Sequence, residues 1–313
     1  MDEATTGPVR GDLIENEAHT AEPVSPPRRR GRRIPVILLS VALALAVGGL
    51  VYGYFTLRDA NAVIDKQRQQ IQEQEELIDT KQTFGAAMQG LMSTVAKFDG
   101  VPFAALVDIP AYQAIATRAW DRRWYAAEVQ AEVVKAQTTQ SELAKKLTGA
   151  RAQATSNATG TALEGTVDQL GRGFVASVLE DVRPLCGRNA LACVFSDDPY
   201  TVHFNTTSNN QPWMTDFIRT GIAYHEFAHV LQFTNPEPTK PAVAAFGGDV
   251  ETMADCFALT YVPGWSLDQR VYISSRAYYD VIVGYGYTCN DDQKQVIRGW
   301  YEKLQFRPTP ISQ

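Results

Sequence analysis

An uncharged apolar stretch, residues 34–57, limits what this 313-residue chain can be more than any other part of its sequence (IPVILLSVALALAVGGLVYGYFTL). A helix needs about 20 apolar residues to cross a hydrocarbon core that is about 30 Å thick. Five arginines lie directly before the stretch, within residues 28–33, and such charge marks the cytoplasmic side of a span. We therefore predict a single-pass signal anchor in the cell membrane, in contact with lipid. Its N-terminus lies in the cytoplasm and all residues after 57 lie outside it.

A cleaved signal peptide is the alternative for the same stretch. Ala60-Asn61-Ala62 resembles a cleavage site, but the charged region before the apolar core would be unusually long. Both interpretations place the rest of the chain outside the cytoplasm.

Residues 1–33 contain six acidic and six basic side chains and few aliphatic ones, so we expect a disordered cytoplasmic tail.

A helical stalk, residues 58–83, is predicted to continue the span. Apolar residues recur there every seven positions, and the chain has no proline or glycine between Thr56 and Phe84. The repeat begins with Leu50 and Leu57 in the span and continues with Ile64, Ile71 and Ile78 in the stalk. The alternate positions are polar, which weakens a coiled coil, whereas Gly49 and Gly53 form a GxxxG pattern in the span. A homodimer through the span and stalk is therefore a hypothesis.

The remaining sequence divides by composition into a helical region and a compact domain. Residues 111–148 contain no glycine or proline and favour one long helix, and residues 151–165 have the Ser/Thr/Gly content of a linker. We therefore expect a helical extracytoplasmic region with its linker at 84–165 and a compact domain at 166–313. A net charge of −6 and a pI near 5.3 argue against a nucleic-acid partner.

All four cysteines lie beyond the predicted span, where disulfides persist. Proximity in sequence favours Cys186–Cys193, which closes a short loop, and Cys256–Cys289, which ties a helix to the C-terminal region. Four cysteines allow three pairings. A thiolate metal site is the alternative, but no CxxC spacing supports it.

Residues 222–231 (IAYHEFAHVL) contain the candidate metal ligands. His225 and His229 are four positions apart, so on a helix both imidazoles can reach one ion, and Glu226 can face a metal-activated water without being a ligand. Glu226 is the one charged residue between Thr220 and Glu237, as expected of a buried helix. The alternative is a helix with two incidental histidines.

A hydrolytic zinc site needs a third protein ligand. No histidine follows His229, so the candidates are the carboxylates Asp249, Glu251 and Asp255. Glu251 and Asp255 are one turn apart on a second predicted helix, so one can bind the metal while the other accepts the N–H of a ligating imidazole. We expect Glu251 to be the ligand, although acidic residues are also common in the first turn of any helix.

At these residues the chain resembles the bacterial neutral zinc metallopeptidases of the gluzincin type, in which HExxH is followed by ExxxD. The matching segments are AYHEFAHVLQ, with the finer form HExxHxxQ, and VETMADCFA, with the form ExxADC. The resemblance covers roughly the last 110 to 140 residues. It implies one Zn²⁺ held by His225, His229 and Glu251, with Glu226 as general base and Asp255 supporting a ligand.

The resemblance also implies a fold and an activity. The fold is mainly α with a small β element (α+β), a zincin-like domain behind the span and stalk. The activity is hydrolysis of a peptide or protein substrate by zinc-activated water. Residues 199–204 (PYTVHF) alternate as a strand does, and an edge strand beside the metal helix binds extended peptide in such folds.

One departure from that family concerns the group that stabilises the oxyanion. Many gluzincins use a histidine that follows the metal ligands, and this chain has none after His229. The candidates that remain are Tyr272, Arg276, Tyr278, Tyr279 and Tyr285. The departure keeps open a non-catalytic alternative, an assembly or sensor protein of the cell envelope with a zinc-stabilised domain. Hydrolysis of a non-peptide bond is a third possibility.

Overall fold

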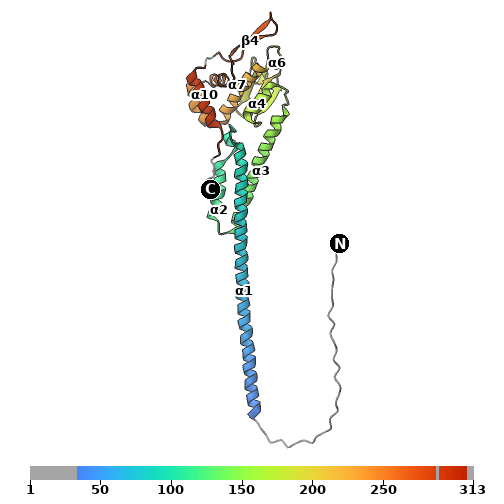
Figure 1. Cartoon of the computed structure of the whole chain (residues 1–313), viewed down its shortest axis with the longest axis vertical. Coiled ribbons are helices and arrows are strands. Elements are labelled where there is room, and N and C mark those ends of the chain that lie inside the picture. The colour runs from blue at the N-terminus through green and yellow to red at the C-terminus, as the bar shows by residue number, and fades with distance from the viewer. Residues whose placement is uncertain (1–33, 287–288, 309–313) are drawn as a thin grey trace, which may run out of the picture. The chain divides into compact units, whose positions relative to one another are not determined.

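The computed structural model describes residues 34–286 and 289–308, with side chains from Leu39 onward; the predicted tail, residues 1–33, lies outside them (Figure 1). The described chain is mainly helical with two small sheets, which confirms the α+β class. The elements that contribute the core and the site are α1 (Ile34–Val95), α2 (Ile109–Asp121), α3 (Ala126–Ser156), α4 (Ala162–Gly171), β1 (Ala176–Glu180), β2 (Ala192–Phe195), β3 (Asp198–Asn205), α7 (Asp216–Thr234), α9 (Val250–Tyr261), β4 (Asp268–Tyr272), β5 (Tyr278–Ile282) and α10 (Asp291–Leu304). Short helical turns connect them: η1 (Ala96–Phe98), η2 (Ala104–Leu106), α5 (Arg183–Cys186), α6 (Thr206–Asn209), α8 (Pro236–Val243) and η3 (Ala244–Phe246).

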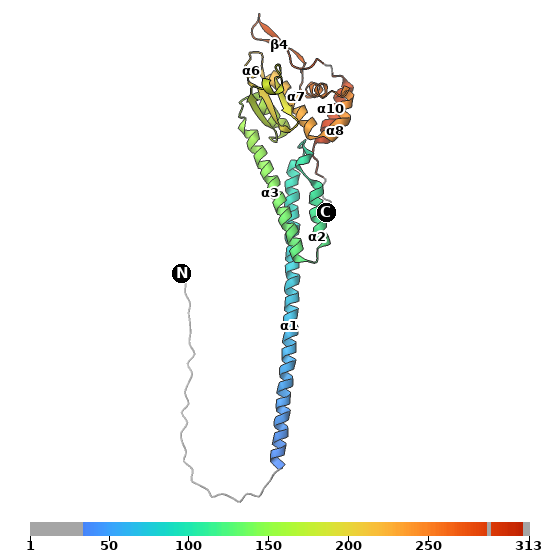
Figure 2. The ribbon, with the colours of Figure 1, turned by 180° about the vertical axis from the view of Figure 1, so that it is seen from behind.

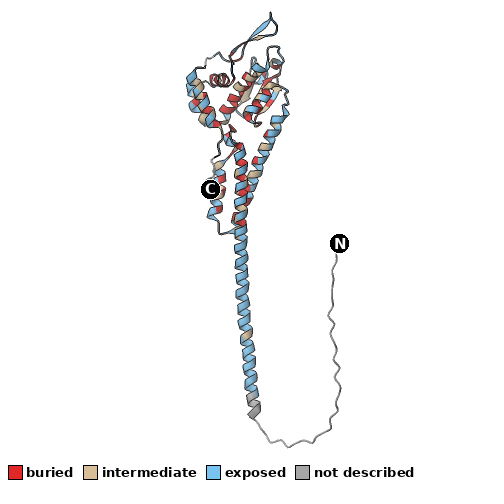
Figure 3. Cartoon of the chain, in the orientation of Figure 1, coloured by how far each residue is buried: buried red, intermediate tan, exposed pale blue. Residues whose placement is uncertain are grey.

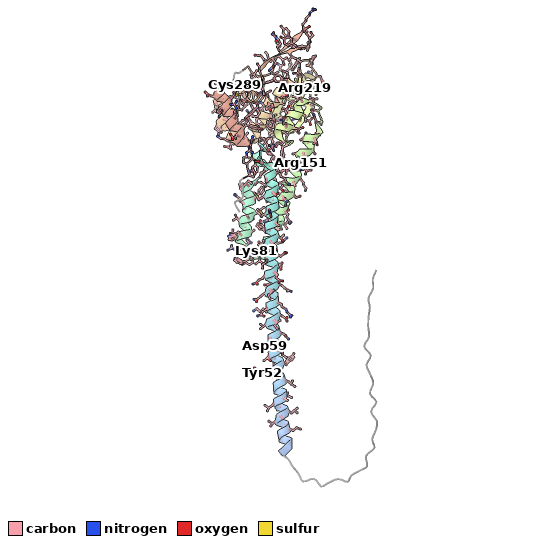
Figure 4. All side chains as sticks on the ribbon, viewed as in Figure 1. Tyr52, Asp59, Lys81, Arg151, Arg219 and Cys289 are labelled. Carbon is pink, nitrogen blue, oxygen red and sulfur yellow. A yellow bond between two sulfur atoms is a disulfide. The ribbon has the colours of Figure 1, made fainter. Side chains whose placement is uncertain are left out.

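Helix α1 is one continuous helix of 62 residues that includes both the predicted span and the predicted stalk. Within the described ranges it is the helix long and apolar enough to cross a membrane. The chain divides into two units between Gln70 and Ile71. In the first unit nearly all described side chains are exposed (Figure 3), and those of Tyr52 and Asp59 project outward from the helix (Figure 4).

The second unit, from Ile71 onward, has one continuous core rather than two domains. Buried side chains run from Leu91 near the end of α1 to Leu304 in α10. Residues 84–165 and 166–313 both lie within this unit. The expected linker, 151–165, is mostly helical, because α3 continues to Ser156 and α4 begins at Ala162.

The single long helix expected at 111–148 is wrong. The chain forms two helices, α2 and α3, which turn back on each other through residues 122–125 (Figures 1 and 2). Because both helices bury apolar side chains, Ile115 in α2 and Val133 in α3 among them, tertiary packing outweighs the local preference for helix. The aromatic side chains of Trp120 and Trp124 lie exposed at the turn.

The larger sheet has the strand order β1-β3-β2, with β3 parallel to β1 and antiparallel to β2. The predicted strand at 199–204 is confirmed as β3, but it is the middle strand and not an edge. The edge strand that packs against α7 is β2. Strands β4 and β5 form a separate two-stranded hairpin that projects from the unit (Figure 1).

Candidate metal centre

Helix α7 carries both histidines on one face. Its first turn is capped by Thr215, whose hydroxyl accepts a hydrogen bond from the backbone N–H of Ile218 at 3.3 Å. Four residues make slightly more than one helical turn, so the Nε2 atoms of His225 and His229 converge to 3.1 Å. The His225 side chain is 12% exposed and that of His229 is 9% exposed, so both imidazoles are largely shielded from water.

Helix α9 supplies the third donor. Gly247 and Gly248 have φ angles of 68° and 85°, a backbone conformation that favours glycine and turns the chain into α9. Asp249 then caps the helix, because its Oδ1 accepts hydrogen bonds from the backbone N–H groups of Glu251 and Thr252. Asp249 is thus a cap and not a ligand, and Glu251 lies in the first turn facing α7.

The three donor atoms form a nearly equilateral triangle. Oε2 of Glu251 lies 3.2 Å from Nε2 of His225 and 3.1 Å from Nε2 of His229. Tetrahedral zinc ligands at bond lengths of about 2.0–2.1 Å lie about 3.3 Å from one another. The group of His225, His229 and Glu251 could therefore hold a metal ion.

Each imidazole is oriented by an acceptor on its far side. Nδ1 of His225 lies 2.8 Å from Oδ1 of Asp255, and Nδ1 of His229 lies 2.8 Å from Oε1 of Gln232. Acceptors at Nδ1 keep the proton there and leave Nε2 free to bind a metal. Asp255 was expected in this role, whereas Gln232 was not assigned one, although it stands three positions after the second histidine.

Gln232 also joins the two helices. Its side-chain amide donates a hydrogen bond to the backbone carbonyl of Val250, at 3.0 Å. Val250 directly precedes Glu251, so one side chain both orients His229 and positions the helix turn that carries the third donor.

The segment after β5 packs directly on Asp255. The backbone N–H of Tyr285 donates a hydrogen bond to Oδ2 of Asp255, at 2.8 Å. A Cβ atom at Gly284 would lie 2.9 Å from both carboxylate oxygens, so this close approach requires glycine. The Tyr285 ring stacks on the His225 imidazole with centroids 6.1 Å apart, which brings one of the oxyanion candidates to the site.

Glu226 lies beside the triangle and outside it. The residue is 6% exposed, and its Oε2 atom is buried without a hydrogen-bond partner. Burial raises the pKa of Glu226, and the neighbouring His225 and His229 offset part of that rise. A buried carboxylate with one free oxygen is suited to accept and return a proton.

The charges of the donor group are strongly coupled. Burial lowers the pKa of His225, but hydrogen bonds to the Asp255 and Glu251 carboxylates raise it to about 10. Burial raises the pKa of Glu251, but hydrogen bonds from His225 and His229 hold it well below its ordinary value. A metal ion entering this site would therefore displace a proton from an imidazole.

A cleft of about 540 Å³ opens over the donor triangle. Its floor is formed by α7 and α9, one wall by residues 186–194, which include β2, and the other wall by residues 282–285. The edge strand and the segment carrying Tyr285 thus face each other across the three donors.

Both predicted disulfides are confirmed. Cys186–Cys193 closes the loop that leads into β2, and both cysteines line the cleft. Cys256–Cys289 joins α9 to the residue just before the cap of α10, where Figure 4 labels Cys289. The second bridge therefore ties the helix that carries Glu251 and Asp255 to the C-terminal segment.

The structure separates the five candidates for oxyanion stabilisation. Tyr285 lines the cleft, whereas Tyr272, Tyr278 and Tyr279 belong to the β4–β5 hairpin and Arg276 to its turn.

His203, on β3, is not part of the donor group. Its Nδ1 atom lies 2.5 Å from Oε1 of Glu180.

Comparison of the chain with protein-family models, curated proteins and solved structures found no match.

Proposed function

We propose that the chain is a membrane-anchored zinc metallopeptidase with a zincin-like catalytic unit. The convergence of His225, His229 and Glu251 to mutual distances of 3.1–3.2 Å is the observation that carries the proposal. Two imidazoles and one carboxylate are the donor set of catalytic zinc sites that keep one position open for water or substrate. The cleft above the triangle leaves room for that position.

A bound Zn²⁺ would polarise the scissile carbonyl and lower the pKa of water towards about 7. Glu226 is placed to accept the proton from the attacking water and to return it to the leaving amine. The position of Glu226 in the lining of the cleft, next to the first histidine donor, supports this role. Tyr285 supplies a hydroxyl that can donate to the developing oxyanion and replaces the absent histidine.

The proposed substrate is an extended peptide. Strand β2 is an edge of its sheet and lines the cleft through residues 192–194, so its free main-chain groups can pair with a peptide laid across the donors. Peptide hydrolysis is favoured over hydrolysis of a non-peptide bond for this reason.

The topology proposed for the enzyme follows from the apolar part of α1 and the arginines before it. The N-terminus lies in the cytoplasm and the catalytic unit lies outside it. Two disulfides in that unit agree with an oxidising compartment. Dimerisation through α1 remains a proposal, for which the exposed Ile64, Ile71 and Ile78 are available.

The test uses the full-length protein in detergent, loaded with one equivalent of zinc. Metal content is measured by mass spectrometry, and cleavage is measured with a peptide library. The wild type should cleave and lose activity to a chelator, and Glu226→Gln should retain zinc while losing cleavage by a factor of about 10²–10⁴. If the wild type binds one zinc ion but cleaves no peptide, the peptidase proposal is contradicted and the assembly or sensor protein is favoured.

A further inference from the structure

The β4–β5 hairpin has two faces of different character. The register pairs Asp268 with Ile282, Arg270 with Asp280, and Tyr272 with Tyr278, and these residues share the outer face. The inner face carries Val271 and Val281, which pack on the core. The hairpin is thus attached through one face, and the paired residues of its other face are exposed (Figure 3).

The outer face carries three large apolar side chains that are exposed to solvent. Ile282 is 72% exposed, Tyr272 66% and Tyr278 49%. Exposed apolar groups that gather on one surface mark an interaction site, whereas single ones are ordinary.

The outer face leads directly into the cleft over the donor triangle. Ile282 lines that cleft and also a shallow cavity of about 410 Å³ on the hairpin, so the two adjoin at this residue. The backbone N–H of Val283 donates to the carbonyl of Leu267 at 2.8 Å, which fixes the base of the hairpin at this junction. An extended segment that lies on the outer face can therefore pass over Ile282 towards the donors.

The aromatic side chains on this face are held in place. Arg270 forms two hydrogen bonds with the Asp280 carboxylate, at 2.7 and 3.1 Å, and its guanidinium lies 4.2 Å from the centre of the Tyr278 ring. The Tyr272 and Tyr278 rings pack at 5.8 Å. Because these rings are already ordered, a ligand that binds them loses little side-chain entropy on their account.

We infer that the outer face of the β4–β5 hairpin binds an extended segment of a protein substrate, one that carries aliphatic or aromatic side chains and flanks the scissile bond. This inference rests on the proposed peptidase function and adds its substrate class: unfolded protein segments rather than short peptides. A membrane surface fits less well, because membrane-binding faces carry excess basic charge, whereas this face carries Arg270 against two acidic residues, Asp268 and Asp280.

Binding is tested with zinc-loaded Glu226→Gln, full length in detergent, and fluorescein-labelled β-casein as the unfolded, apolar probe. Adding Tyr272→Ser and Tyr278→Ser should weaken binding about tenfold in fluorescence anisotropy, because two aromatic contacts are lost. The matched control adds Trp120→Ser and Tyr125→Ser, which remove two exposed rings at the α2–α3 turn, and should bind as the parent does. Equal binding by the hairpin variant and its parent would overturn the inference.

A second measurement covers the case in which the hairpin variant does not fold. A photo-crosslinking amino acid replaces Tyr272 alone, in the Glu226→Gln protein reconstituted into phosphatidylcholine–phosphatidylglycerol vesicles. A covalent adduct with β-casein is expected; an adduct with lipid, or none, would overturn the inference.

The two proposals fail separately. Casein binding that depends on the hairpin, in a protein whose wild type never cleaves casein, would contradict the peptidase and leave the polypeptide-binding surface. If the wild type cleaves casein but the hairpin substitutions leave casein binding unchanged, only the proposed polypeptide-binding surface is contradicted.

Discussion

Asp255 and Tyr285 meet through a backbone hydrogen bond: the N–H of Tyr285 lies 2.8 Å from Oδ2 of the carboxylate whose Oδ1 faces His225. One carboxylate therefore orients a proposed metal ligand and also anchors the segment that carries the proposed oxyanion donor. The position of the His225 imidazole and the position of the Tyr285 segment therefore depend on the same side chain.

Replacing Asp255 should weaken zinc binding without removing a ligand. We expect Asp255→Asn to lower zinc affinity by about 10- to 100-fold, because the amide no longer fixes the proton on Nδ1 of His225. Competition with a fluorescent chelator measures the affinity. The matched control is Asp249→Asn on the same helix, which should bind zinc as the wild type does, since asparagine caps helices as well as aspartate. Equal affinity of the Asp255 variant and the wild type would contradict its role.

The hydroxyl of Tyr285 should matter for the chemical step and not for the metal. We expect Tyr285→Phe to lower kcat by about 10²–10³, with zinc content and KM nearly unchanged, because loss of an oxyanion donor affects the transition state. Steady-state kinetics on a peptide substrate separates the two constants. Tyr279→Phe, in the preceding strand β5 and outside the cleft, serves as the control. A variant that lost zinc or changed only KM would rule out the proposed role.

The two disulfides should have different effects on the metal. Removing Cys256–Cys289 with paired serine substitutions should cost about 4 kcal/mol in the chain-entropy model and should also lower zinc affinity, because the bridge holds the helix of Glu251. Removing Cys186–Cys193 should cost about 2 kcal/mol and leave zinc affinity nearly unchanged, because that bridge touches none of the three donors. Thermal unfolding and zinc titration of both double variants check this. Equal zinc affinity in the two variants would show that the Cys256–Cys289 bridge does not support the site.

Asp168 should make the stability of the second unit depend on pH. Burial, and next the nearby Glu164, raise the pKa of Asp168 from 3.8 to about 6, and neither carboxylate oxygen has a hydrogen-bond partner. Because the folded state holds this proton more tightly than the unfolded state, the fold loses stability as pH rises from about 4 to about 6. We expect Asp168→Asn to be more stable than the wild type at pH 7 by on the order of 2 kcal/mol, and equal to it at pH 4.

Urea unfolding at the two pH values measures this difference. Asp59→Asn, at an exposed position on α1, is the control and should change neither value. A constant difference between Asp168→Asn and the wild type at pH 4 and pH 7 would contradict the titration.

The donor group could be predicted from the sequence because helix geometry converts spacing into position. His225 and His229 had to share a face once the segment was helical, and Glu251 and Asp255 follow the same rule on the next helix. The two disulfides could also be predicted from the sequence, because each joins cysteines that are neighbours in sequence order.

Other features depend on contacts that spacing does not describe. Gln232 acquires its role from the carbonyl of Val250, and Gly284 from the carboxylate of Asp255, two contacts set by how whole segments pack. The turn at residues 122–125 contains no glycine or proline, so only the packing of α2 and α3 reveals it. From the sequence, Tyr272, Tyr278 and Tyr279 are candidates for stabilising the oxyanion. Only the fold shows that these hairpin residues lie outside the cleft.

The compact arrangement of donors on α7 and α9 also bears on how the protein acquires its metal. All three donors lie within residues 225–251, so bringing them together closes a short loop, and the entropy cost of closing a loop rises only slowly with its length. Contacts between this segment and the chain that follows η1 close a far longer loop, as the hydrogen bond from Asn235 to Pro102 illustrates. An ion present during folding would therefore meet a nearly complete set of ligands before the rest of the unit has assembled, and could act as a nucleus for it.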